Sequence, residues 1–279
     1  MKTIRAAFSC EMRKIFWRAK YCAMLAVYAA IGLGASMAGA SGYSLRAVTE
    51  FTFTVTGPNV VFGALSMYRT FLIPLAVFML CADVFTHEIE SKSIKCVLTR
   101  PISRFDAYIA KCLAILCYVA IALGAGFAAV VAWQAAASLF AGNAAPAADT
   151  LIESARARGV AAASFASQAS MAAEAFASYA LTLVPMAAFI AFSAFISVLI
   201  RSPALVMFLC IVSYLAMSFF GTFYGGAGAM LFTTYSGWYR MWLGERLPLR
   251  SIATAAGLLV STCVAFFGFG YFLFDKKEI

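Results

Sequence analysis

Six long apolar runs constrain this chain more than any other feature of its sequence. They cover residues 21–40, 67–85, 108–140, 175–200, 204–224 and 252–274. A helix of about 20 apolar residues crosses the hydrocarbon of a bilayer. Because 64% of the residues are hydrophobic and only 12% are charged, the chain has too few polar residues to cover a water-soluble core of this size. We therefore predict an all-α integral membrane protein with six spans, forming a single domain over residues 1–279.

The basic residues gather at the ends of these runs. Most of the 21 lysines and arginines lie in residues 1–20, 86–107, 201–203 and 275–279, together with Lys111. Positive charge marks the cytoplasmic side of membrane helices, so we expect both ends of the chain to be cytoplasmic. The net charge of +9 is divided among these short clusters. It therefore does not predict a nucleic-acid-binding face.

Residues 1–20 have the pattern of an amphipathic helix. The apolar residues recur at helical spacing, and they are Ile4, Phe8, Met12, Ile15 and Phe16. No small-residue cleavage pattern follows a short apolar core, so we expect a retained cytoplasmic segment. The pattern predicts a helix that lies on the inner leaflet, with Trp17 at the interface.

The segments expected on the outer side differ in character. Residues 51–56 alternate between apolar and polar side chains before a turn at residues 57–59, which suggests a short strand but does not establish one. Residues 141–174 read as an Ala-rich linker followed by a surface helix. Residues 225–250 contain Gly-rich and Trp-rich stretches, which we interpret as short helices that dip into the outer leaflet.

The sequence carries no pattern for chemistry of its own. It contains no GxxxxGK[ST] loop for phosphate, and its single histidine, His87, is accompanied by no GxSxG serine motif. Its eight cysteines include no CxxC pair, and none lies in an expected outer loop, so we expect neither a metal site nor disulfides. We assign no catalytic, cofactor-binding or metal-binding residue. If the protein uses ATP and Mg²⁺, a separate subunit must bind them.

Charged residues are concentrated in one inner segment, HEIESKSIKCVLTRPISRFDAYIAK, at residues 87–111. A short amphipathic helix here would pair Glu88 with Lys92, and Pro101 would end it. Ser103 can cap the next helix, which continues into the third span. A solvated loop whose positive charges only fix the topology is the simpler interpretation of the same residues.

The order of residues in this segment resembles the loop between the second and third spans of ABC-2 type ABC transporter permeases. The matching positions are Glu90, Ser93, Ile94, Leu98, Pro101, Ser103, Arg104 and Lys111. The chain departs from the family at Lys92 and Ser93, where glycine and threonine are common. A second resemblance is FSAFISVLIRSPALVMF, in which Arg201, Ser202 and Pro203 form a tight inner turn between the fourth and fifth spans.

This resemblance implies that residues 86–107 contain a coupling helix that docks on an ATPase subunit. The implied interface consists of Phe85, Glu88, Ile89, Glu90, Lys92, Ser93, Pro101 and Arg104, with Phe85 and Ile89 as apolar anchors. It also implies two copies of an ABC ATPase, which would bind ATP and Mg²⁺, and a second permease in a homodimer or heterodimer. The second and fifth spans would line the contact between permeases, and the candidate residues are Ser213, Ser218, Gly221 and Thr222.

The resulting hypothesis is a permease subunit of an exporter in a bacterial plasma membrane, surrounded by lipids. Aromatic and Met-rich spans suit an amphipathic or hydrophobic substrate such as a peptide, an antibiotic or a lipid, although the same residues also suit lipid contact and helix packing. One alternative is an ATP-independent carrier, which would need functional charges inside the spans. Another is a membrane scaffold or immunity protein, which would only bind partners.

Overall fold

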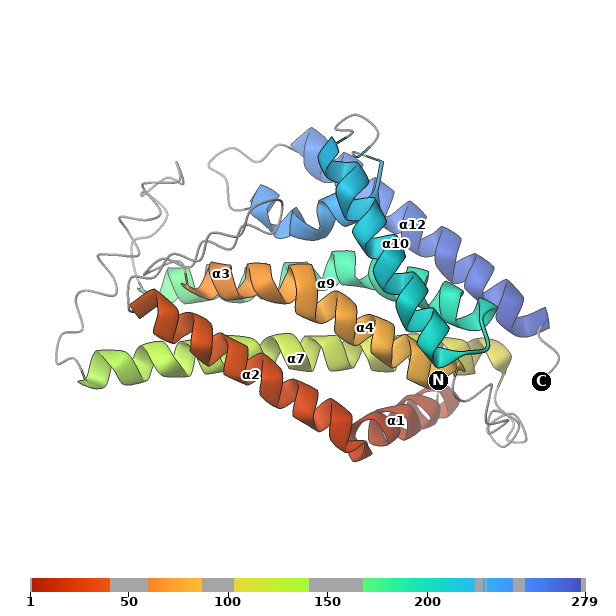
Figure 1. Ribbon diagram of the computed structural model, residues 1–279, viewed down its shortest axis with the longest axis horizontal. Coiled ribbons are helices and arrows are strands. Elements are labelled where there is room, and N and C mark those ends of the chain that lie inside the picture. Colours follow the sequence, from red (N-terminus) through yellow and green to blue (C-terminus); the bar gives the residue numbers. More distant parts are fainter. Residues whose placement is uncertain are drawn as a thin grey trace.

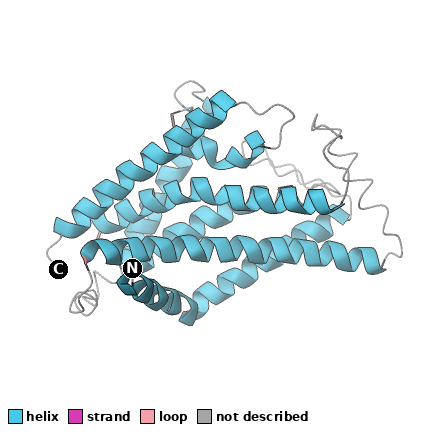
Figure 2. Cartoon of the chain, turned by 180° about the vertical axis from the view of Figure 1, so that it is seen from behind, coloured by secondary structure: helices cyan, strands magenta, loops and turns pink. Residues whose placement is uncertain are grey.

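The computed structural model of the chain describes residues 2–40, 60–86, 103–140, 168–223, 228, 230–242 and 249–276. Nearly all of these residues are helical and none of them forms a strand (Figures 1 and 2). The helices are α1 (Lys2–Trp17), α2 (Ala19–Ala40), α3 (Val60–Met67), α4 (Ile73–Cys81), α7 (Arg104–Phe140), α9 (Gln168–Leu199), α10 (Pro203–Phe223) and α12 (Leu249–Lys276). The all-α prediction is confirmed for these residues. The suggested strand at 51–56 and the linker after residue 140 lie outside them.

Five helical stretches are long and apolar enough to cross a membrane. They are Ala64–Thr86, Arg104–Trp133, Ala175–Leu199, Pro203–Gly221 and Leu249–Lys276. These stretches match the second to sixth predicted spans. The first predicted span is helical in α2, but its apolar stretch, Ala19–Gly34, is shorter. The chain is therefore a multi-pass membrane protein, whereas the sixth crossing and the orientation stay predictions.

The second predicted span is one continuous rod that contains two wide π turns. The first, η2 (Tyr68–Leu72), joins α3 to α4, and the second, η3 (Ala82–Thr86), follows α4. Pro74 has no N–H with which to bond the Thr70 carbonyl in an α-helical pattern. The Tyr214 hydroxyl of α10 donates to this carbonyl instead, at 2.6 Å. π turns occur often at functional positions of helices.

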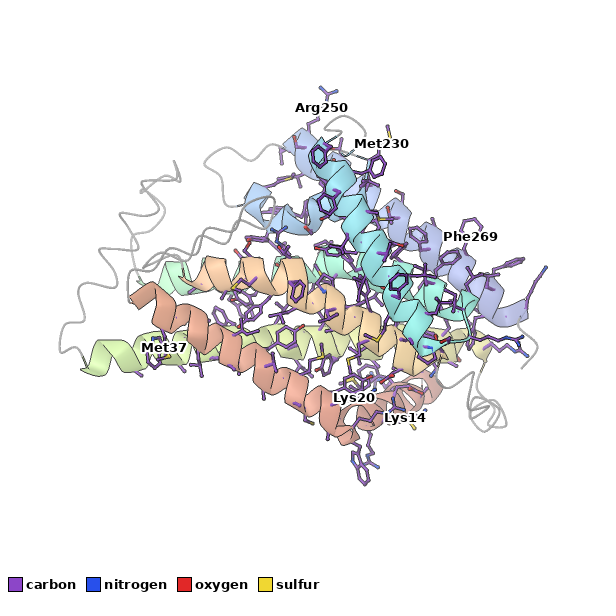
Figure 3. The ribbon with its side chains drawn as sticks, viewed as in Figure 1. Lys14, Lys20, Met37, Met230, Arg250 and Phe269 are labelled. Atoms are coloured by element: carbon purple, nitrogen blue, oxygen red, sulfur yellow. The ribbon has the colours of Figure 1, made fainter. Side chains whose placement is uncertain are left out.

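The helices form a buried centre and a more open edge. In the apolar windows of the second span and of α9, 67% of the residues are buried, compared with 17% in α10 and α12. α10 and α12 cross the central helices obliquely in Figure 1. The large apolar side chains that α10 leaves exposed are Leu205, Phe208, Val212, Leu215, Phe219, Phe220 and Phe223. In Figure 3, Phe269 of α12 likewise points away from the bundle.

Tyrosine side chains cross between the central helices and bond their backbones. The Tyr68 hydroxyl donates to the Tyr28 carbonyl of α2 at 2.8 Å, and the Tyr118 hydroxyl of α7 donates to the Tyr21 carbonyl at 2.9 Å. The Tyr68 ring fits between Gly32 and Gly126, where added Cβ atoms would lie 2.5 and 2.7 Å from its atoms. These contacts hold α2, the second span and α7 together.

α1 is amphipathic as predicted, but the protein itself covers its apolar side. Ile15 is 1% exposed, and Phe8, Met12 and Phe16 pack against the core. α1 packs mainly on α7. The predicted position of α1 at the inner leaflet stays a prediction, but its apolar side faces the bundle and not the lipid. The spacing defined the apolar face correctly, but it could not show which apolar surface covers that face.

The remaining boundaries refine the predicted organisation. α9 begins at Gln168, so residues 168–174 continue this helix and are not part of an outer loop. Within 225–250, η4 (Phe232–Trp242) is a short 3₁₀ helix with a kink at Gly237, and it packs on α9, α10 and α12. The turn was predicted at Arg201, Ser202 and Pro203. In the structure residues 200–202 are not helical, and Pro203 already begins α10. Proline is well suited to a first helical position.

A charged junction as the candidate functional site

A cluster of charged and polar side chains lies where α1, α2, η3 and α7 meet. In Figure 3, Lys14 and Lys20 mark its position at the corner between α1 and α2. We define the charged junction as Glu11, Lys14, Arg18, Lys20, Tyr21, Asp83 and Lys111. Asp83 lies one turn before residue 86, and Lys111 lies two turns after Ser103. The charged junction therefore flanks both ends of the predicted coupling segment.

Asp83 of η3 binds the bend between α1 and α2. Its Oδ2 atom accepts from the Arg18 guanidinium at 3.3 Å and contacts Lys20 Nζ and the Tyr21 hydroxyl. α1 ends at Trp17 and α2 starts at Ala19, so these partners lie at the bend and in the first turn of α2. A carboxylate is also favourable near a helix N-terminus, because the helix dipole is positive there. Asp83 thus fixes the angle at which the chain enters α2.

Lys111 of α7 joins α1 to the second span. Its side chain is 1% exposed, and its Nζ atom donates to the Val84 carbonyl at 3.1 Å and lies 3.5 Å from Glu11 Oε1. Glu11 also accepts from Lys14 at 2.9 Å. A charge this deeply buried needs both hydrogen bonds and a counter-charge. Glu11 is part of α1, so this compensation for the burial of Lys111 depends on α1 remaining in place.

η3 is consequently the point at which three neighbouring parts of the bundle are held. Asp83 binds the α1–α2 bend, the Val84 carbonyl accepts from Lys111 of α7, and the Thr86 hydroxyl donates to the Ser197 carbonyl of α9 at 2.9 Å. A displacement of η3 would act on all three at once. The π turn thus links the second span directly to the α1–α2 bend, α7 and α9.

The space that the charged junction encloses is small. Glu11, Lys14, Ile15, Arg18, Tyr21, Asp83 and Val84 line a hollow with room for about one water molecule. Within the part of the chain that the structure describes, no three His, Cys, Asp or Glu side chains are grouped so as to hold a metal ion. The ion pairs and hydrogen bonds described above are the interactions that hold the charged junction together.

The structure places only two of the residues predicted for the ATPase interface. Phe85 is fully buried, with its ring 5.4 Å from the Tyr108 ring, so the prediction that it anchors a docking partner is wrong. Apolar character marked Phe85 as an anchor, but the bundle uses that side chain itself. Arg104 donates to the Asp275 carbonyl near the end of α12 at 2.6 Å. Glu88, Ile89, Glu90, Lys92, Ser93 and Pro101 lie outside the described residues.

Two further local predictions can be compared with the structure. The Ser103 hydroxyl accepts from the Asp106 N–H at 3.0 Å, which confirms that Ser103 caps α7. In the turn after α9, Arg201 and Ser202 are exposed.

The residues predicted to face a second permease differ in their surroundings. Ser213 and Ser218 of α10 are half-buried. Gly221 approaches the backbone of Gly228, where an added Cβ would lie 2.8 Å from Gly221, so it serves packing within the chain. The side chain of Thr222 is not among those described.

Sequence reasoning did not bring Glu11, Asp83 and Lys111 together. One signal was present, because Glu11 falls on the apolar stripe of the first helix, between Phe8 and Ile15. Ionisable residues at the ends of the second and third spans were a second signal. Pairing them required knowledge of which helices are neighbours.

Comparison with known proteins identifies a family. A family model described as "ABC-2 family transporter protein" matches residues 7–194, which is more than half of the chain. The matched region includes most of α1, the whole charged junction and the predicted coupling segment, whereas the turn at 201–203 lies beyond it. No curated protein matches the chain.

Proposed function

Because this chain belongs to the ABC-2 family of transporter proteins, we propose that it is the permease subunit of an ATP-driven exporter. The family match over residues 7–194 is the observation that carries the proposal. In it, two ATPase subunits bind ATP and Mg²⁺ and act on a pair of permeases in a bacterial plasma membrane. The substrate is an amphipathic or hydrophobic peptide, antibiotic or lipid, in keeping with the aromatic and Met-rich spans.

The proposed route of coupling runs through residues 86–107. Closure of the ATPase pair on ATP would move this segment and shift the permease pair between inward and outward access. The geometry of the charged junction supports the proposal, because η3 precedes the segment and is bonded to the α1–α2 bend, α7 and α9. Movement of the segment would therefore reach these helices together. Of the two predicted apolar anchors, only Ile89 is retained.

The alternative of an ATP-independent carrier depends on functional charges within the spans. Charged residues do occur there, but their contacts fix helices. Asp83 binds the α1–α2 bend, Lys111 binds Glu11 and Val84, and Arg69 donates to Ser236 of η4 at 2.7 Å. These contacts favour a structural role over a path for ions.

The proposal is tested by whether the predicted coupling segment binds an ATPase. We expect Ile89→Asp to abolish recovery of a P-loop ATPase with the purified permease, together with substrate-stimulated ATP hydrolysis. An anchor that fills a pocket typically costs about 2 kcal/mol or more when removed, whereas an exposed charge costs about 0 to 1 kcal/mol. The matched control Lys92→Ala should therefore change little. Unchanged recovery and hydrolysis with Ile89→Asp would reject the coupling segment. A permease that never co-purifies with an ATPase would favour the carrier or scaffold alternatives.

A further inference from the structure

The outward face of α1 forms a basic stripe that ends in tryptophan. Arg5, Ser9, Arg13 and Trp17 are spaced four residues apart, so they lie along one side of the helix. All four are exposed, and the Trp17 side chain is 85% exposed. The opposite side of the helix is covered by the bundle, as Ile15 shows. The stripe is therefore the surface that α1 presents to its surroundings.

The charge of this stripe is purely positive. Glu11 is the only acidic residue in α1, and it is buried and paired with Lys14 and Lys111. Among the described residues, Arg5 and Arg13 take part in no ion pair. Two helical turns separate them, so each guanidinium can bind a separate phosphate group. The stripe is thus complementary to an anionic surface.

The position of Trp17 indicates which anionic surface this is. Tryptophan is enriched where membrane helices pass the headgroups, because its ring is apolar and its N–H can bond polar groups. Trp17 immediately precedes the bend into α2, which exposes Val27, Leu33 and Met37 further along. Among the described side chains of α1, no other large apolar side chain is left exposed. The Trp17 end of the stripe consequently lies beside the helix that exposes these apolar side chains.

We propose that the Arg5–Ser9–Arg13–Trp17 stripe binds anionic phospholipid headgroups. The arginines bind the lipid phosphates, and Trp17 lies among the headgroups. The apolar side of α1 does not enter the membrane, since it is already packed against the core. Attraction on this stripe is therefore electrostatic, so it depends on lipid charge and weakens with salt. The charged junction holds α1 in the orientation that presents the stripe.

The test uses the full-length protein in bilayer discs of equal parts phosphatidylcholine and phosphatidylglycerol. Bromine, which quenches tryptophan fluorescence, is carried on the chains of one lipid or the other. The difference between the native protein and Trp17→Phe isolates the Trp17 signal. We expect brominated phosphatidylglycerol to quench Trp17 more strongly than brominated phosphatidylcholine. High salt should abolish this preference, because it screens the attraction between the arginines and the lipid phosphates.

Substitution of the arginines supplies the decisive comparison. A basic residue near an anionic surface changes partitioning by about five-fold, so Arg5→Gln with Arg13→Gln should remove the preference. Arg201→Gln, which removes an exposed charge from the turn after α9, is the matched control and should retain it. Equal quenching by both lipids, or a preference that survives the double substitution or high salt, would overturn the proposal. The proposal would also be overturned if the native protein showed no lipid preference and the double variant lost ATPase recovery. In that case the stripe would bind a protein. The salt dependence of the native protein decides the matter even if a variant fails to fold.

Discussion

At the scale of single residues, Lys111 shows how a charge inside a membrane protein can serve the fold. Its hydrogen bond to the Val84 carbonyl and its proximity to Glu11 compensate for the loss of water. The contact with Lys111 explains in turn why an acidic residue, Glu11, lies within the otherwise basic residues 1–20. The contact draws α1 onto α7, and it lies on the side of α1 opposite the basic stripe.

We expect Glu11→Gln to destabilise the protein strongly, because it removes the carboxylate that lies 3.5 Å from the buried Lys111 Nζ atom. Removing one partner of a buried pair typically costs about 3–5 kcal/mol. Thermal unfolding of the full chain in detergent measures the change. Glu11→Gln combined with Lys111→Met should be less destabilising than Glu11→Gln alone, since no buried charge is stranded.

The control for this experiment is Lys14→Gln. Lys14 also pairs with Glu11, but more than a third of its side chain is exposed. The Lys14→Gln substitution should therefore lower the free energy of unfolding by only about 0–1 kcal/mol. Equal losses for Lys14→Gln and Glu11→Gln would show that Lys111 does not depend on Glu11.

At the scale of elements, glycines decide how closely α2 and α7 approach the second span. Gly126 of α7 lies against the Tyr68 ring, where an added Cβ would be 2.7 Å from two ring atoms. Gly124, on the same helix, has no neighbour within 4 Å of an added Cβ. Two glycines that look alike in the sequence therefore have different roles.

Gly126→Ala should lower the melting temperature, whereas Gly124→Ala should leave it unchanged or raise it. Forcing a methyl group into a packed contact typically costs about 1–3 kcal/mol. At an open helical position, alanine is favoured over glycine by about 1 kcal/mol. Tyr68→Leu in the Gly126→Ala background should recover part of the loss by vacating the space of the ring. A similar response of both glycine variants would show that Tyr68 does not fill the gap.

At the scale of the whole molecule, the open face of α10 is the candidate contact for a second permease. The second span was predicted to share this contact, but it is buried in the centre of the chain and α10 is not. The exposed face of α10 includes Phe208, Val212 and Phe219. Within a membrane, such a face can be covered by lipid or by another helix.

A cysteine at Phe219 should crosslink two copies of the permease in native membranes, because this position projects from α10. The same substitution at Phe269 of α12, which is similarly exposed, is the matched control and should give little dimer. Dimer bands on denaturing gels provide the measurement. Equal crosslinking from both positions would indicate random collision, and its absence from Phe219 would place the partner elsewhere.

The sequence by itself determined the class of this protein and much of its local structure. The apolar runs are longer than a water-soluble core needs, so they indicated a membrane protein. The order of residues around Pro101 and Arg104 indicated the ABC-2 family. Periodicity defined the apolar face of α1, and Ser103 marked the start of α7 through its cap. These features depend on residues close together in the chain, so sequence reasoning could reach them.

Only the tertiary structure decided what covers each apolar face and which distant charges meet. Phe85 and Ile15 have the same character as lipid-facing or partner-facing residues, yet the chain buries both. Asp83 and Lys111 could be recognised as unusual, but their partners Arg18 and Glu11 lie far away in the sequence. The physical reason is that hydrophobicity has no direction, whereas burial and ion pairing depend on which helices are neighbours in space.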